Sequence, residues 1–181
     1  EYLEIGLQTR TDPETVRAAL DAALSPGLDV LEAVEAGPGS LADRIDASHW
    51  RIELPGITPE TLERAVTAFR DAPDVSVERL TKQGRRQLDA RTPVTRIEVK
   101  SEGDAPSGVG AAPCAILDLV VRQVTPSVRP DDVLSGLRVV ADLEPPVPPR
   151  ATRLAQGSLT AQGEIVDPLA ADRDGATIGG S

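Results

Sequence analysis

The densest set of chemically useful side chains is a run of basic residues in the middle of the chain. Between Lys82 and Lys100 the sequence has six basic and two acidic residues, a formal charge of +4 inside a chain of net charge −10. A local reversal of charge indicates a site for an anionic partner. Most of these residues are arginines, whose planar guanidinium donates two parallel hydrogen bonds to a phosphate. The alternative is a solvated surface loop, since charged runs are common on surfaces.

We predict that this run forms one electropositive surface together with an arginine from a later segment. No aromatic residues are interleaved with the basic ones, which argues against stacking of bases as the main contact. The expected contact is therefore with phosphate groups. The candidate RNA- or anion-binding residues are Lys82, Arg85, Arg86, Arg91, Arg96 and Arg129.

The sequence contains no recognisable catalytic constellation. Glycine-rich dinucleotide or phosphate loops, paired histidines and Cys-x-x-Cys pairs are all absent. His49, the only histidine, could act as a general base, but no nucleophile or ligand set accompanies it, so we expect a polar residue near a strand start. Cys114, the only cysteine, is expected to be structural. We therefore predict no catalytic residue, no metal site and no cofactor, and we disfavour an independent hydrolase or transferase.

Two further residues have a structural and a functional interpretation. Trp50 could stack on a base or a sugar, but a single tryptophan on an alternating strand more often belongs to a core. Asp118 interrupts an apolar run and is expected to form a salt bridge across a sheet with Arg96 or Arg91. A catalytic acid is the less favoured interpretation of this aspartate.

The composition predicts a protein with an aliphatic core. The chain has 181 residues, of which 40% are hydrophobic, with one Trp, one Tyr, one Phe and no Met. A single cysteine excludes an intramolecular disulfide and a cysteine-based metal site. No apolar window approaches the roughly 18 residues that a membrane span needs. We expect a cytoplasmic protein without a membrane partner.

The first 40 residues read as one strand–helix–strand cycle. Glu1–Leu7 alternates polar and apolar residues, as a strand does. Asp12 followed by Pro13 is typical of a helix N-cap and first turn. Leu28–Val34 is predicted to be the returning strand. We interpret residues 1–40 as the second half of a first βαβ unit.

For residues 45–157 the sequence predicts a longer arrangement of strands and helices of the same kind. Helices are expected after Thr58 and after Ser127, each with a proline at its start. The segment between the strands at Asp74–Leu80 and Val94–Val99 is predicted to be a basic loop. The remaining predicted strands are His49–Leu54, Cys114–Val124 and Ala151–Ala155, and 158–181 is predicted to be a disordered C-terminal tail.

This order of elements predicts an α+β fold built from ferredoxin-like split βαβ units. Its sheet would be antiparallel, with the helices on one face. Residues 45–157 would form a ferredoxin-like unit, and the first unit would be truncated.

Four segments, in the same order, resemble a known bacterial family. They are Tyr-Leu-Glu-Ile-Gly-Leu at the start, Leu24–Ala33, Thr-Lys-x-Gly-Arg-Arg-x-Leu-Asp-x-Arg at Thr81–Arg91, and Thr-Pro-Ser-Val-Arg-Pro-Asp-Asp-Val-Leu at Thr125–Leu134. Together they resemble the radical-SAM-associated (radical-SAM-linked) family, a domain of unknown function. The resemblance covers about residues 1–157.

The resemblance implies an accessory role. Members are fused behind a radical SAM enzyme or encoded beside one, often near a ribonuclease of the E/G type, which points to RNA metabolism. The family normally has a further basic strand–helix–strand ahead of the position of Glu1, so the chain is expected to lack that segment. With one cysteine it cannot hold an iron–sulfur cluster of its own.

Two functional hypotheses follow from these observations. The first is a non-catalytic accessory domain of a radical SAM system that binds RNA through the basic segment. The second is a protein–protein scaffold that docks the radical SAM partner through apolar and acidic surfaces, without contact to RNA.

Overall fold

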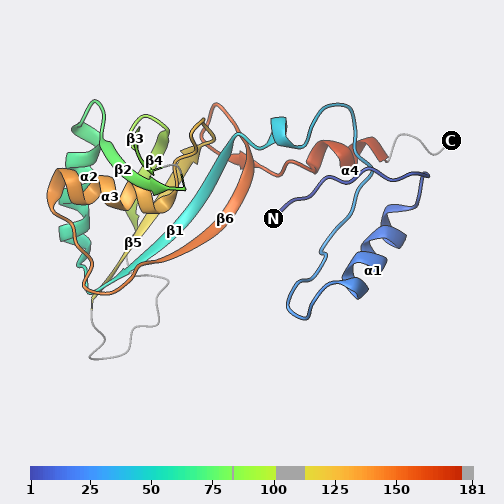
Figure 1. The fold of residues 1–181 in the computed structure, drawn as a ribbon, viewed down its shortest axis with the longest axis horizontal. Coiled ribbons are helices and arrows are strands. Elements are labelled where there is room, and N and C mark those ends of the chain that lie inside the picture. Colours follow the sequence, from blue (N-terminus) through green and yellow to red (C-terminus); the bar gives the residue numbers. More distant parts are fainter. Residues whose placement is uncertain (83, 101–112, 177–181) are drawn as a thin grey trace. The chain divides into compact units, whose positions relative to one another are not determined.

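The structure is a computed structural model that describes residues 1–82, 84–100 and 113–176 (Figure 1). The chain divides into two compact units. Unit 1 combines residues 1–44 with the C-terminal part from Asp167 onward, and unit 2 comprises Ile45–Val166. The sequence of Ser101–Pro113, rich in Gly, Ala, Pro and Ser, predicts a flexible loop, and all of it except Pro113 lies outside the described residues.

Unit 2 is built on a five-stranded antiparallel sheet. Its order is β4-β5-β1-β6-β7, and every neighbouring pair is antiparallel. Seven of the nine residues of β5 are buried, because β5 lies between β4 and β1. The strands predicted at Val94–Val99 and Cys114–Val124 are therefore confirmed, and they pair with each other. The strands are β1 (Ala47–Pro55), β4 (Val94–Lys100), β5 (Cys114–Arg122), β6 (Arg150–Leu159) and β7 (Ile165–Val166).

Two helices, α2 (Pro59–Asp71) and α3 (Pro130–Ala141), contribute to one hydrophobic core with the same face of this sheet. Phe69 of α2 and Ile52 of β1 are fully buried in that core. Gly136 of α3 lets the helices approach, since a β-carbon there would lie 2.8 Å from the Phe69 ring. The predicted α+β fold is confirmed, with helices on one face of an antiparallel sheet.

The prediction that the segment between Leu80 and Val94 is a loop is wrong. The chain forms a separate two-stranded antiparallel ribbon, β2 (Ser76–Thr81) and β3 (Gly84–Asp89), that does not pair with the main sheet in the described residues. Gly84 adopts a φ of +111°, which a residue with a β-carbon rarely does, and so allows the tight turn. Without the ribbon, the order β1-α2-β4-β5-α3-β6 is that of a split βαβ fold.

The predicted helix starts are confirmed at two of three positions. Asp12 Oδ2 accepts from Thr15 N at 3.1 Å, and Thr58 Oγ1 accepts from Thr61 N at 3.3 Å. Ser127, however, does not cap α3. The N-cap of α3 is Arg129, whose own backbone N–H donates to the Asp132 carboxylate at 2.7 Å.

Unit 1 contains less regular structure than the sequence predicts. Residues 1–44 are all described and hold only helix α1 (Pro13–Ala23) and the 3-10 turn η1 (Ala42–Arg44). The strands predicted at Glu1–Leu7 and Leu28–Val34 are wrong. Alternation of side chains is not sufficient for a strand, whose backbone must also pair with a neighbouring strand, and neither segment pairs with a strand in the described residues.

The C-terminal segment, predicted to be disordered, instead carries regular elements. Strand β6 runs to Leu159, β7 pairs with it, and helix α4 (Ala170–Ala176) follows. Asp172 of α4 accepts from Arg44 Nη1 at 2.6 Å and from Gly37 N at 3.0 Å, so polar contacts hold this segment within unit 1. Within the described residues, no helix combines the length and the apolar content that crossing a bilayer requires.

Candidate nucleic-acid interface

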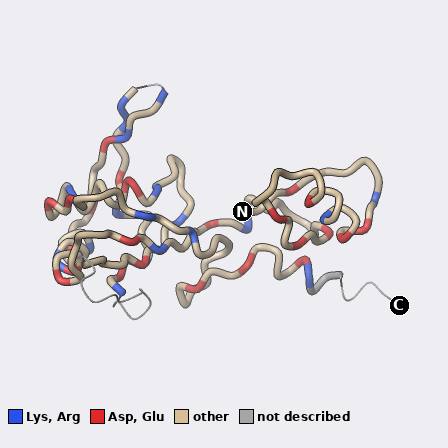
Figure 2. The backbone as a smooth tube through the Cα atoms, turned by 90° about the horizontal axis from the view of Figure 1, so that it is seen from below, with Lys and Arg blue, Asp and Glu red and all other residues tan. Residues whose placement is uncertain are grey.

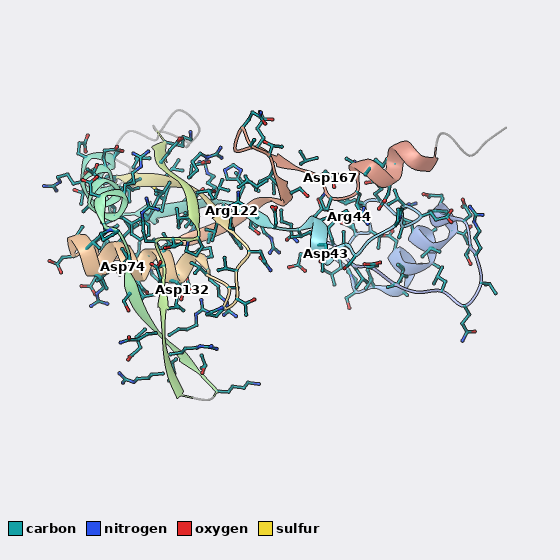
Figure 3. All side chains as sticks on the ribbon, turned by 90° about the horizontal axis from the view of Figure 1, so that it is seen from above. Asp43, Arg44, Asp74, Arg122, Asp132 and Asp167 are labelled. Carbon is teal, nitrogen blue, oxygen red and sulfur yellow. The ribbon has the colours of Figure 1, made fainter. Side chains whose placement is uncertain are left out.

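The β2–β3 ribbon is fixed to the start of α3 by a buried ion pair. Arg79 of β2 donates through Nε to Asp132 Oδ1 at 2.9 Å, and its Nη2 contacts Asp132 Oδ2 and donates to Ser127 O at 2.8 Å. These hydrogen bonds raise the pKa of Arg79 despite partial burial. In Figure 3 Asp132 lies where the ribbon leaves the body of unit 2. Arg79 pairs with Arg86 in the ladder, so the ribbon is anchored in the half nearer its turn.

The C-terminal end of β3 is held by the carboxylate of its last residue, Asp89. Asp89 accepts backbone N–H groups from Val75 at 3.0 Å, Arg91 at 2.8 Å and Thr92 at 3.2 Å. Burial alone would raise the pKa of Asp89, but the hydrogen bonds from Thr92 and from these amides outweigh burial and lower it. The ionised aspartate thus fixes the turn between the ribbon and β4.

Three of the six predicted binding residues lie together near the end of the ribbon. Lys82 follows β2 directly, and Arg85 and Arg86 are the second and third residues of β3. All three side chains are exposed. Figure 2 shows basic residues on both strands beside this end. Arg85 forms a solvent-exposed ion pair with Glu78 at 2.8 Å, a contact of little net stability that a phosphate can replace.

Two other predicted residues are engaged within the protein. The Arg91 guanidinium lies over the Phe69 ring, 5.9 Å from its centroid, and donates to the carbonyls of Val94 and Arg70, each at 3.3 Å. Arg96 donates through Nε to Asp118 Oδ1 at 3.1 Å. The predicted salt bridge across the sheet is confirmed for Arg96. Neither side chain lies on the ribbon.

Asp118 also binds the only histidine. His49 Nε2 lies 2.7 Å from Asp118 Oδ2 and 3.3 Å from Nη2 of Arg96. A single nitrogen cannot donate to the aspartate and accept from the arginine with one tautomer, so the shorter contact assigns the proton to Nε2. This His–Asp–Arg cluster lies on the sheet face opposite the helices, because Asp118 alternates with the core residues Leu117 and Leu119.

The last predicted residue, Arg129, lies at the mouth of a pocket instead of on the ribbon. Arg129 is exposed at the N-terminus of α3. It lies two residues beyond Ser127, whose carbonyl accepts a hydrogen bond from Arg79 of the ribbon. The pocket also contains Arg122 and Arg153. Sequence reasoning missed both. The signal for Arg153 would have been the pairing of β6 with β1, which sets it directly opposite Trp50.

The comparison with family models decides the family. Residues 1–130 match the family described as an uncharacterized protein conserved in bacteria, DUF2344. The chain belongs to this family. No curated protein and no solved structure matches it. The DUF2344 match includes unit 1 up to Arg44, the ribbon and strands β1 to β5, and ends at the first residue of α3.

The match therefore includes all six predicted residues but excludes Arg153 on β6. Nothing in it refers to a radical SAM enzyme. Within the residues that the structure describes, no group of three or more His, Cys, Asp or Glu side chains could hold a metal ion.

Proposed function

We propose that this DUF2344 protein is a non-catalytic accessory module of a radical SAM system in the bacterial cytoplasm, and that it binds RNA with the end of its β2–β3 ribbon. The observation that carries this proposal is the ribbon itself. Lys82, Arg85 and Arg86 are exposed together near the turn of a two-stranded element that Arg79 anchors to α3.

An anchored ribbon suits electrostatic contact with a nucleic acid. The antiparallel ladder and the Arg79–Asp132 pair restrict the backbone, so binding needs to order only the side chains near the end. Basic side chains on such a support neutralise neighbouring phosphates and release counterions. The three candidate side chains contact backbone phosphates and do not read bases, which predicts binding with little sequence preference.

The test is a charge-neutral ribbon. Lys82→Gln, Arg85→Gln and Arg86→Gln together should weaken the binding of a single-stranded RNA by at least about tenfold at low salt, measured by fluorescence anisotropy. The matched control is Arg64→Gln, Arg70→Gln and Arg138→Gln, which removes the same charge from helices α2 and α3. Equal weakening in both variants would mean that only net charge matters, and the proposal would fail.

Unit 1 supports the second candidate function, docking of a protein partner. Six of its large aliphatic side chains are exposed, with Leu31 at 92% and Leu3 at 77%. Exposed apolar side chains that lie close together are typical of an interaction surface, and these come from two short segments, residues 3–7 and 24–31. The others are Ile5, Leu7, Leu24 and Leu28.

The radical SAM partner is the occupant we propose for this surface. It should co-purify with the protein after nuclease treatment and in high salt, because apolar contacts do not weaken with ionic strength. Leu28→Ser with Leu31→Ser should abolish co-purification, while the ribbon variant retains it. Loss of the partner on nuclease treatment alone would show that RNA bridges the two proteins and would exclude direct docking.

A further inference from the structure

A cavity of about 390 Å³ opens in unit 2 where the N-terminus of α3 meets strands β1 and β6. Ser48 and Trp50 line it from β1, and Arg153 from β6. The segment 127–131 closes the side formed by α3. The volume lies within the range of about 300–1,000 Å³ typical of small-molecule sites. This pocket is separate from the end of the ribbon.

The lining of this pocket is cationic. Arg122, Arg129 and Arg153 contribute to it, against a single carboxylate, Asp131. The neighbouring Asp132 is buried and paired with Arg79, so it does not offset these arginines. Three arginines around one cavity are unusual in a chain of net charge −10 and favour an anion with several oxygen acceptors.

The pocket also offers a flat surface. The Arg153 guanidinium lies over the Trp50 ring, 5.2 Å from its centroid, while Trp50 itself packs against the hydrophobic core. One face of the Arg153 guanidinium is thus covered by the Trp50 indole. Nucleic-acid bases stack on guanidinium planes as well as on aromatic rings. Ser48, Gln123 and Ser127 add hydroxyl and amide groups that can hydrogen-bond to a sugar or to a base edge.

We propose that this pocket binds one nucleotide, with its phosphate held by Arg122 and Arg129 and its base stacked over Arg153 and Trp50. The ligand is either a free nucleoside monophosphate or the 5′-phosphorylated end of an RNA. The proposal goes beyond RNA binding by the ribbon and does not depend on it, because the two sites use different residues.

The sole tryptophan provides a direct readout. Titration of the full chain with adenosine 5′-monophosphate should change Trp50 fluorescence saturably, whereas adenosine without the phosphate should bind at least about tenfold more weakly. Arg129→Gln with Arg153→Gln should weaken the monophosphate by at least about tenfold. The ribbon variant at Lys82, Arg85 and Arg86 should leave this titration unchanged.

Two further ligands distinguish the sources of the phosphate. A tetranucleotide with a 5′-phosphate that binds more tightly than the free monophosphate, and more tightly than the same tetranucleotide without the phosphate, identifies an RNA end. Equal affinity of the free monophosphate identifies a mononucleotide. Either result supports the pocket.

Three results would overturn the proposal. They are no saturable fluorescence change with millimolar monophosphate, equal binding of adenosine and its monophosphate, and unchanged binding by the double arginine variant with a native circular dichroism spectrum. Loss of RNA binding in the ribbon variant, with monophosphate binding intact, would separate the two sites.

Discussion

Helices α1 and α2 begin alike and end in different surroundings. Each has an N-cap side chain, a proline at its first position and a glutamate next to it. Helix α2 buries Leu62, Ala65, Val66 and Phe69, whereas no residue of α1 is buried. The comparison teaches that capping residues determine where a helix starts, while its contribution to stability depends on the surface that its apolar stripe meets.

Charged residues are also distributed unevenly between the two units. Unit 1 has 12 acidic and 4 basic residues, and unit 2 has 17 acidic and 15 basic ones. The acidity of the whole chain is thus concentrated in the unit without a large core. The nearly balanced unit carries both the basic ribbon and the arginine-lined pocket. An acidic protein can therefore offer an anion-binding surface, because electrostatic recognition depends on local charge.

The largest contrast is expected from matched truncations of one apolar side chain in each unit. Phe69→Ala should reduce the free energy of unfolding by about 3–5 kcal/mol, because it leaves a cavity in a closed core. Leu31→Ala should change it by less than about 0.5 kcal/mol, since Leu31 is exposed. Urea unfolding followed by Trp50 fluorescence measures both. Similar losses would contradict the exposed position of Leu31.

A buried ion pair in each unit provides the next test. Asp132→Ala leaves Arg79 without its carboxylate and should cost about 2–4 kcal/mol of unfolding free energy. Asp172→Ala breaks the similarly buried pair with Arg44 in unit 1. We expect it to leave the Trp50-detected transition unchanged and to accelerate amide hydrogen exchange only in unit 1. A lower global midpoint for Asp172→Ala would mean that the units unfold together.

Removal of the two matching caps should give a smaller effect. Thr58→Ala should cost about 1 kcal/mol of global stability, because α2 is part of the core of unit 2. Asp12→Ala should reduce only the helical content of α1, seen as faster exchange of its first amides. Equal global effects of the two substitutions would contradict the contrast between these helices.

Acid should affect unit 1 through its ion pairs. Hydrogen bonds from Arg44 and Arg173 lower the pKa of Asp172 and of Glu32, respectively. A lowered folded-state pKa contributes stability that is complete above the unfolded value, near 4, and is lost as the pH falls through the folded value. Tyr2, which donates to Asp167 at 3.3 Å, reports on unit 1, and Trp50 reports on unit 2. We expect the tyrosine circular dichroism signal to change at higher pH than the Trp50 fluorescence. Coincident changes would contradict this order.

Sequence patterns predicted much of unit 2 and little of unit 1. Proline-led helix starts and the apolar run of β5 identified elements that meet a common core, and Asp118 was correctly paired with Arg96. In the ribbon, alternation predicted β2, at Asp74–Leu80, but missed β3, which is a strand because its backbone pairs with β2. Glu1–Leu7 alternates but pairs with no strand in the described residues, so its pattern was misleading.

The candidate site was predictable only where it is contiguous in sequence. Lys82, Arg85 and Arg86 lie within five positions of one another, so charge counting found them. Arg153 reaches the pocket only because β6 pairs with β1, a contact between residues about a hundred positions apart. No local pattern carries that information. Conversely, local charge could not show that Arg91 contacts the Phe69 ring and the carbonyls of Val94 and Arg70.

The salt dependence of RNA binding tests the central claim most directly. The logarithm of the binding constant of the full chain should fall linearly with the logarithm of salt concentration, and the slope should decrease in magnitude by about 2 when Lys82, Arg85 and Arg86 are changed to Gln, as expected at about 0.7 per phosphate contact on a single strand. The control at Arg64, Arg70 and Arg138 should retain the slope. An unchanged slope in the ribbon variant, or no binding at low salt, would contradict the proposal that the ribbon contacts RNA.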